Sequence, residues 1–341
     1  SNRKWLIDGA PAGTHDEEAV KGFGYHLPGL FDRVIDIEKC WLQQEPSNTI
    51  RLFIKDFTLE HKLSYYNVRA HEGLMRNVVI RCNGKGEFMV IVVINEENDL
   101  IRNVMIPEMQ KRFPEIISIM LVINNKFNDI ITDLPFENVY GEECLIETMK
   151  APREGHDDLK FRVGPVSFFQ TNVYQGERLY KAAFDLADVQ GDELMYDLYT
   201  GTGTIALYFA RFVKKVVGVE YVEEAIADAK INSEFNNINN VKFYAGDMAK
   251  VFTDEFIESN GHPDLVVTDP PRAGMHEKVV EQLLKIQPKK IVYISCNPAT
   301  QARDLQLLDA KYEVKAVQPV DMFPHTHHVE NIVLLELKVE N

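Results

Sequence analysis

Short apolar segments alternate with segments of helical pattern from about Phe184 to the end of the sequence. The apolar segments have the length of strands: Leu194–Leu198, Val216–Glu220, Val241–Ala245, Leu265–Thr268 and Lys290–Ser295. Helices are predicted around them: Thr204–Phe212, Val222–Phe235, Lys278–Lys285 and Ala299–Leu308. Near-continuous apolar strands separated by helices indicate a parallel sheet covered on both faces. We therefore predict an α/β, Rossmann-like domain over residues 151–341, with its ligands at the carboxyl ends of the strands.

Residues 1–150 have a different pattern, with short strands and turns. Asn77–Cys82 and Glu87–Asn95 flank the turn residues 83–86, which predicts a β-hairpin. Three further segments are predicted, the strands Glu115–Asn124 and Asn138–Thr148, the second broken by Gly141, and the helical Gln43–Asn67. We expect a smaller N-terminal α+β domain.

Composition excludes several classes of protein. Of the 341 residues, 45% are hydrophobic and 26% charged, as in ordinary globular proteins. A formal net charge of −15 argues against attachment to nucleic acid by bulk charge, but it leaves a local nucleic-acid site open. No segment has the ~18–20 consecutive apolar residues of a membrane helix, and the N-terminus lacks a signal-peptide pattern.

The four cysteines are far apart and form no C-x-x-C pair: Cys40, Cys82, Cys144 and Cys296. This favours reduced thiols, so we expect a cytoplasmic protein. We also expect a monomer, without a membrane partner. The sequence begins Ser1-Asn2 without an initiator Met. We expect either a tag remnant there or a fragment of a longer protein.

The first predicted strand of the Rossmann-like domain runs into a glycine-rich turn. Gly201 and Gly203, followed by Ala206, fit the G-x-G-x-x-G/A pattern, in which glycines allow a tight turn and close approach of the backbone to a ligand. Glu220 ends the next strand, where a carboxylate can accept both hydroxyls of a ribose. The motif alone fits a dinucleotide and S-adenosylmethionine equally.

Two later strand ends favour S-adenosylmethionine over NAD. Asp247 ends the third strand, where it suits the exocyclic amine of an adenine. Asp269, followed by Pro270 and Pro271, ends the fourth strand, and methyltransferases use an acid-Pro-Pro strand end to hold a planar amide or base edge. A dehydrogenase has no evident need for that motif.

Cys296 lies at the carboxyl end of the next strand, just before a predicted helix. This position predicts a partly exposed thiol with a lowered pKa, whereas Cys40, Cys82 and Cys144 are expected to be structural. Glu330, before the closing strand Asn331–Lys338, is the candidate general base near that thiol.

Three histidines cluster just before Glu330, at positions 325, 327 and 328. They have neither helical spacing nor a nearby Cys or carboxylate with zinc-site geometry, so no metal site is predicted.

Five ordered motifs together resemble the RNA uracil-5-methyltransferase family, which makes 5-methyluridine in 23S ribosomal RNA and in tRNA. The motifs are Phe168-Phe169-Gln170-x-Asn172, Asp197-Leu198-Tyr199-x-Gly201-x-Gly203-Thr204, Asp269-Pro270-Pro271-Arg272-x-Gly274, Ser295-Cys296-Asn297-Pro298-x-Thr300 and His328-Val329-Glu330. The resemblance covers about Val163 to the C-terminus. The family commonly has Cys where this chain has Thr200, but the neighbouring glycines are kept.

The resemblance implies a mechanism at uracil C5, which is a weak nucleophile. The Cys296 thiolate adds to C6, C5 then takes the methyl group of S-adenosylmethionine, and Glu330 removes the C5 proton. Asp269 can accept a hydrogen bond from uracil N3–H, and cytosine has no proton there. This argument for Asp269, together with the order of the motifs, disfavours methylation of cytosine or of DNA.

The same resemblance implies which residues line the cofactor: Gln170, Tyr199, Thr204, Glu220, Asp247 and Asp269, with Gly201 and Gly203 in the turn. Phe168 and Phe169 are candidates for stacking on an unstacked base, with an ordinary core role as the alternative for one of the two.

Many family members carry an N-terminal RNA-binding β-barrel followed by iron–sulfur cysteines, and this sequence shows neither. We expect no iron–sulfur cluster, with Cys40 either an orphan ligand or a buried thiol, because one cysteine cannot hold a cluster. The expected substrate is 23S ribosomal RNA, with tRNA as the alternative. Two alternative functions remain. One is an NAD-dependent oxidoreductase, against which the acid-Pro-Pro motif argues. The other is a non-catalytic RNA-binding module, against which the presence of both Cys296 and Glu330 argues.

Overall fold

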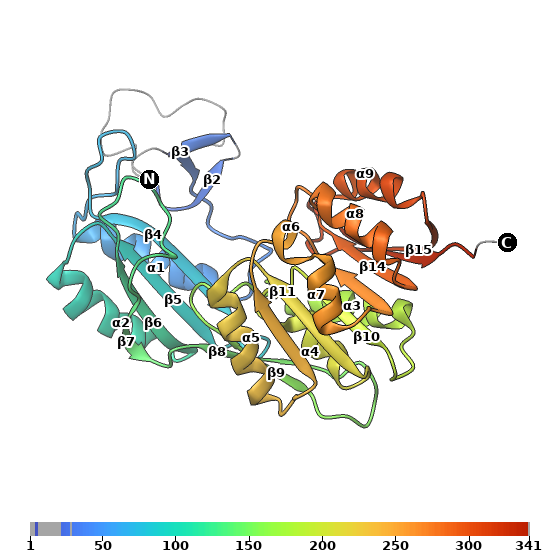
Figure 1. Ribbon diagram of the computed structural model, residues 1–341. Coiled ribbons are helices and arrows are strands. Elements are labelled where there is room, and N and C mark those ends of the chain that lie inside the picture. Colours follow the sequence, from blue (N-terminus) through green and yellow to red (C-terminus); the bar gives the residue numbers. More distant parts are fainter. Residues whose placement is uncertain (1–3, 6–21, 28, 340–341) are drawn as a thin grey trace. The chain divides into compact units, whose positions relative to one another are not determined.

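The computed structural model describes residues 4–5, 22–27 and 29–339 of the chain (Figure 1). It divides into two compact units. The first comprises residues 1–145 with Gly164–Val166, and the second comprises Ile146–Val163 with Ser167–Asn341. No helix among the described residues has the length and hydropathy required to span a bilayer.

The second unit is built on a seven-stranded sheet in the order β12-β11-β10-β13-β14-β16-β15. Its strands are β10 (Leu194–Leu198), β11 (Lys215–Glu220), β12 (Val241–Ala245), β13 (Leu265–Thr268), β14 (Lys290–Ser295), β15 (Tyr312–Val320) and β16 (Glu330–Leu337). The first five strands are parallel, and β16 pairs antiparallel with β14 and β15. Because β10 lies in the middle, the loops after β10, β11, β13 and β14 meet at one edge of the sheet. The predicted Rossmann-like α/β fold is confirmed.

Helices cover both faces of this sheet. They are α3 (Val173–Ala187), α4 (Thr204–Ala210), α5 (Glu223–Phe235), α6 (Met248–Val251), α7 (Asp254–Asn260), α8 (Glu277–Ile286) and α9 (Pro298–Leu308). Alternate strand residues such as Leu198, Val219 and Tyr293 join one core with residues of α7, α8 and α9. In the central strands β10, β11, β13 and β14 the remaining residues, such as Met195 and Val292, are mostly buried as well. Two-sided burial explains why these strands are apolar throughout.

The first unit contains a four-stranded sheet, β4 (Met75–Cys82), β5 (Phe88–Ile94), β6 (Ile116–Ile123) and β7 (Glu137–Gly141). Its other elements are α1 (Ser47–Glu60), the π-helix η1 (Ile101–Met105), α2 (Ile106–Arg112), and a small sheet of β1 (Lys4–Trp5), β2 (Tyr25–Leu27) and β3 (Leu30–Ile35). A hydrophobic core joins α1, η1 and α2 to the larger sheet. The predicted α+β class is confirmed for this unit.

Local predictions in the first unit were mostly confirmed. The β4–β5 hairpin forms across residues 83–86, where the Asn83 side chain accepts hydrogen bonds from the amides of Lys85 and Glu87. The helix predicted over Gln43–Asn67 was too long, because α1 spans only Ser47–Glu60. The strand predicted over Asn138–Thr148 is two strands, β7 and β8 (Leu145–Met149), and β8 pairs with β9 (Leu159–Val163).

Candidate active site

The glycine-rich turn after β10 places backbone amides at the carboxyl edge of the sheet. Tyr199, Gly201 and Gly203 all have positive φ, at 65°, 55° and 80°. A Cβ on Gly203 would lie 3.0 Å from both Ala229 Cβ and Phe243 Cζ, so this glycine is required for close packing as well as for its conformation. A Cβ on Gly201 would meet nothing within 4 Å, so this side of the turn is open for a ligand.

Glu220 is held against that turn. Its carboxylate accepts hydrogen bonds from the amide of Gly201 at 3.1 Å and from the amide of Val222 at 3.0 Å. The carboxylate predicted to bind a ribose therefore lies directly beside the glycine-rich loop, in a fixed orientation.

The Thr200 side chain bonds to a buried carboxyl next to the glycine-rich turn. Its hydroxyl donates a 2.5 Å hydrogen bond to the fully buried carboxyl of Asp197. Burial raises the pKa of Asp197 to about 7. Thr200 thus donates to one oxygen of a buried acid, so its hydroxyl is engaged inside the protein and not at the open side of the turn.

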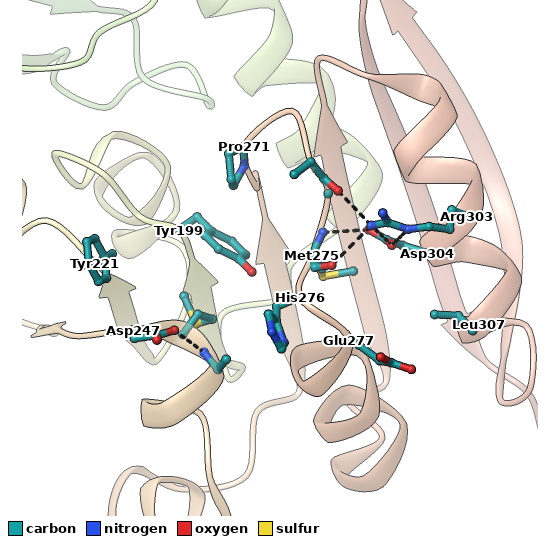
Figure 2. Close-up of a pocket in the computed structure, with 14 residues that line it drawn as sticks. Tyr199, Tyr221, Asp247, Pro271, Met275, His276, Glu277, Arg303, Asp304 and Leu307 are labelled. Atoms are coloured by element: carbon teal, nitrogen blue, oxygen red, sulfur yellow. Dashed lines mark hydrogen bonds and ion pairs between the residues drawn. The ribbon is translucent and has the colours of Figure 1, made fainter.

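A pocket of about 850 Å³ opens beside this turn (Figure 2). Its walls come from the ends of β10, β11 and β12, the segment after β13, and α9; the lining residues are Tyr199, Tyr221, Asp247, Met248, Ala249, Pro271, Ala273–Glu277, Arg303, Asp304 and Leu307. Figure 2 shows Tyr199 between Asp247 and Tyr221 on one side and Pro271 and His276 on the other. Aromatic and polar groups that converge on one cavity suit a planar ligand with polar substituents.

Asp247 keeps its charge at this pocket. Its carboxylate accepts a hydrogen bond from the amide of Ala249 at the start of α6 and lies 3.2 Å from the Lys250 ammonium. These contacts hold the pKa of Asp247 below its usual value. An ionised acceptor is the group expected to meet an exocyclic amine.

Cys296 and Glu330 are brought together by the register of two strands. β14 and β16 are antiparallel, and Ser295 pairs with Asn331. Cys296 follows the last residue of β14 and Glu330 begins β16, so the two lie at the same end of neighbouring strands. The Asn331 side chain donates a 2.7 Å hydrogen bond to Gln301 of α9, and Gln301 donates to the carbonyls of Tyr293 and Asn331, which fixes this end of the sheet.

The expected lowering of the Cys296 pKa was wrong. Burial and the nearby carboxyls of Glu330 and Asp269 raise the pKa of the half-buried thiol, because both would repel a thiolate. The Arg272 guanidinium, hydrogen-bonded to the thiol, opposes this effect. The first turn of α9 is capped by the side chain of Asn297, which accepts from the amide of Ala299. The free protein therefore holds Cys296 chiefly as a thiol.

The two carboxyls also hold protons more strongly than usual. Burial raises the pKa of Glu330 to about 7, with Arg272 opposing the shift. Burial and the carboxyls of Glu330 and Asp197 raise the pKa of Asp269 well above its usual range. Carboxyls with raised pKa values that lie beside a thiol are candidates to exchange protons during a reaction.

Arg272 is a residue to which the sequence pattern gave no role. Its backbone carbonyl accepts hydrogen bonds from the side chains of Asn297, at 3.0 Å, and Thr300, at 3.1 Å. Its guanidinium faces both Cys296 and Glu330. The signal was present in the sequence, because Arg272 directly follows the acid-Pro-Pro strand end and Asn297 directly follows the cysteine.

The two phenylalanines before Gln170 have different environments. Phe169 is buried and packs against Phe161, with ring centroids 5.7 Å apart. Phe168 is 69% exposed, and its carbonyl accepts a 3.4 Å hydrogen bond from Thr202 in the glycine-rich turn. Phe169 is therefore the core aromatic, and Phe168 alone is available to a ligand.

Comparison with known proteins gives the family. The family model described as tRNA (Uracil-5-)-methyltransferase matches residues 143–338. A protein of Bacteroides thetaiotaomicron named as an uncharacterized RNA methyltransferase is 52% identical over 99% of this chain and 74% of its own length. The chain belongs to the tRNA (uracil-5-)-methyltransferase family. The resemblance inferred from the five motifs is confirmed, and so is the class of enzyme.

Two further relatives agree with this family. A protein of Porphyromonas gingivalis, also named as an uncharacterized RNA methyltransferase, is 47% identical over the whole chain and 73% of its own length. The crystal structure of the tRNA (uracil-54, C5)-methyltransferase of Pyrococcus abyssi, in complex with S-adenosyl-L-homocysteine, superposes with a TM-score of 0.72 at 33% identity. It covers 89% of this chain and 70% of that one.

Within this family fold, the predicted site residues fall into two neighbouring groups. The first group surrounds the pocket: Tyr199 and Asp247 line it, and Glu220 directly precedes the lining residue Tyr221. Gly203 caps α4 in the glycine-rich turn, and Thr204 is the first residue of that helix. The other group is Cys296, Glu330 and Asp269, joined by Arg272. Pro271 lines the pocket, and Asp269 lies two residues before it at the end of β13, so the two groups share one strand end.

The remaining histidines and cysteines form no further centre. Among the residues that the structure describes, no group of three or more His, Cys, Asp and Glu side chains is placed to hold a metal ion. The rings of His327 and His328 stack on each other with centroids 4.3 Å apart, and His328 meets Phe323 edge to face. No disulfide links the four cysteines, all of which the structure describes.

Proposed function

We propose that this chain transfers a methyl group from S-adenosylmethionine to C5 of a uracil in RNA, through a covalent bond between Cys296 and C6. The observation that carries the proposal is the meeting of Cys296, Glu330, Asp269 and Arg272 beside a glycine-rich turn and an 850 Å³ pocket. A thiol, a base near its working pKa and a base-edge acceptor are what this reaction requires.

The residues around the pocket fit S-adenosylmethionine. Its adenine has an aromatic neighbour in Tyr199 and an ionised acceptor in Asp247, and its ribose hydroxyls have Glu220 beside the open Gly201. When bound, S-adenosylmethionine supplies an electrophilic methyl group.

Cys296 is the nucleophile in this proposal. Its thiolate adds to C6 of uracil, and the electron pair of the C5–C6 double bond moves to C5 and O4, so that C5 becomes nucleophilic. Since the thiol has a raised pKa in the free protein, it must first lose its proton to solvent, and the guanidinium of Arg272 stabilises the resulting thiolate.

Glu330 completes the reaction as the general base. C5 takes the methyl group as the bond between that group and the sulfonium sulfur breaks, which leaves S-adenosylhomocysteine. The carboxylate of Glu330 then takes the C5 proton, the C5–C6 double bond re-forms, and the C6–S bond breaks to release Cys296 as a thiolate. A carboxyl with a pKa of about 7 is well matched to this task, because it is partly ionised at neutral pH and strongly basic for a carboxylate.

Asp269 is the proposed base-edge contact, and its protonation state decides what it recognises. A neutral carboxyl offers one donor and one acceptor, which can pair with uracil or with cytosine. An ionised carboxylate only accepts, and so it favours uracil, whose N3–H donates. Donation from N3–H favours the ionised form and would lower the raised pKa of Asp269.

The proposed target is 23S ribosomal RNA, with tRNA as the second candidate because the Pyrococcus abyssi relative is a tRNA methyltransferase. Residues 1–150 carry a formal charge of −6 and residues 151–341 one of −9, so neither half provides bulk attraction to RNA. We therefore infer that binding depends on the captured base and on local contacts.

Methyl transfer from radiolabelled S-adenosylmethionine to each RNA tests this function. We expect label in 5-methyluridine after nuclease digestion of treated, unmodified 23S ribosomal RNA, and none in 5-methylcytidine. Label in tRNA alone would assign the second target. Binding of NADH without binding of S-adenosylmethionine would contradict the proposal.

The rate of methyl transfer should rise with pH. Both Glu330, with a pKa of about 7, and the Cys296 thiol, whose pKa is raised, must lose a proton before they act. We expect kcat/KM for RNA to rise steeply below pH 7 and less steeply above it, where Glu330 is already ionised. Initial rates at saturating S-adenosylmethionine, from about pH 6 to 9, measure this. A profile that falls over that interval would contradict the assigned roles.

A further inference from the structure

Gly176 lies within the first two turns of α3, away from any turn or strained backbone. Glycine inside a helix costs about 1 kcal/mol relative to alanine, so its presence there needs a reason. A Cβ on Gly176 would lie 2.9 Å from Cβ of Gln170 and 3.4 Å from its Cγ. The missing side chain therefore makes room for Gln170 to pack directly against the helix.

Tyr180 stands one turn further along the same face of α3. Its hydroxyl is hydrogen-bonded to the side chain of Gln170, and both side chains are buried, at 4% and 9% exposed. Burial and the charges of Asp269, Asp197 and Glu330 raise the pKa of this hydroxyl, so it stays protonated. Residues four apart on a helix project side by side, so Gly176 and Tyr180 form one cradle around Gln170.

The N-terminus of α3 is itself fixed at this edge of the sheet. Asn172 caps the helix through the amide of Gln175, and its side-chain amide donates a 2.8 Å hydrogen bond to the carbonyl of Met322. The segment that precedes α3 is thus tied to the loop that leads to Glu330, and Gln170 packs against the helix itself. Its amide is held by packing on one side and by a hydroxyl on the other.

We propose that Tyr180 and Gly176 are positioning residues, which orient the side-chain amide of Gln170 toward the bound S-adenosylmethionine. This inference rests on the proposed function, in which Gln170 contacts the cofactor. An amide whose rotamer is fixed beforehand loses less conformational entropy on binding, so the cradle increases cofactor affinity without touching the cofactor.

A double-mutant cycle on the full chain tests this inference. Tyr180→Phe should weaken binding of S-adenosylmethionine about three- to tenfold, as expected for one lost hydrogen bond, and leave kcat within about twofold. In a Gln170→Ala background the same substitution should have no further effect, because a residue that acts through Gln170 has nothing left to orient. Gly176→Ala should behave in the same way.

Tyr208→Phe is the matched control. Tyr208 is also buried, and its ring centroid lies 6.2 Å from that of Tyr180. Within the described residues, no contact links Tyr208 to Gln170. It should leave cofactor affinity unchanged. Equal losses from Tyr180→Phe in both backgrounds, or no loss in either, would overturn the positioning role alone. Failure of the unaltered protein to bind S-adenosylmethionine would instead overturn the proposed function.

Discussion

Cys296→Ala should abolish methyl transfer to RNA and leave binding of S-adenosylmethionine unchanged. The thiol is close enough to the carboxyls of Glu330 and Asp269 and to the Arg272 guanidinium for their charges to shift its pKa, whereas the glycine-rich turn and the pocket are formed by other residues. Without a sulfur atom to add to C6, C5 is not activated, so the rate should fall by a factor on the order of 10⁴ or more. Transfer of a radiolabelled methyl group and calorimetric titration of the cofactor measure the two effects.

Cys144→Ala is the control for this substitution, because Cys144 is half-buried in the first unit, outside the candidate site. It should keep the methylation rate of the unaltered protein. Methylated uridine formed by Cys296→Ala at more than a small fraction of the normal rate would exclude the covalent route. Loss of cofactor binding in the same variant would show that Cys296 supports the pocket.

The central strands of the parallel sheet could be predicted from sequence because they are buried on both faces, and the partly exposed edge strand β12 because its residues are mostly apolar. Val241–Ala245, Leu265–Thr268 and Lys290–Ser295 have the bounds that their apolar runs predict. The glycine-rich turn could be predicted for a related reason, since its positive φ angles demand particular residues at particular places. Local sequence carries both kinds of signal.

Elements without such a signal were missed. β15 is a long edge strand whose side chains are mostly exposed, so its residues form no apolar run. α3 precedes the alternating pattern and has a glycine at position 176, which a sequence reading takes as unfavourable for a helix. Here the glycine reflects the packing of Gln170 against the helix, a contact between residues that the local pattern does not connect.

The pKa of Cys296 could not be predicted from its neighbours in sequence. A strand end before a helix favours a lowered thiol pKa, but the two carboxyls that raise the pKa of Cys296 come from other strands. Glu330 arrives through the antiparallel register of β14 and β16, and Asp269 through the end of β13. Residue identity therefore indicated the candidate nucleophile, while its protonation state depends on tertiary structure.

Glu330→Gln should trap a covalent complex between the protein and RNA. Removal of the carboxylate takes away one of the charges that raise the pKa of Cys296, so addition of the thiol to C6 should be at least as favourable as before. The C5 proton then has no acceptor, and release of the product should slow by about 10²–10⁴-fold. The adduct should appear as a shifted band on a denaturing gel when RNA and S-adenosylmethionine are both present.

Two variants make this result specific. Glu336→Gln changes a carboxylate on the same strand, opposite Lys290 and away from the thiol, so it should turn over normally and form no lasting band. Cys296→Ala combined with Glu330→Gln should also give no band, because the sulfur that forms the bond is missing. If Glu330→Gln alone gave normal turnover, another group would be the base. If it gave neither turnover nor adduct, Glu330 would act before the thiol adds, as the acceptor of the thiol proton, since addition to C6 requires the thiolate.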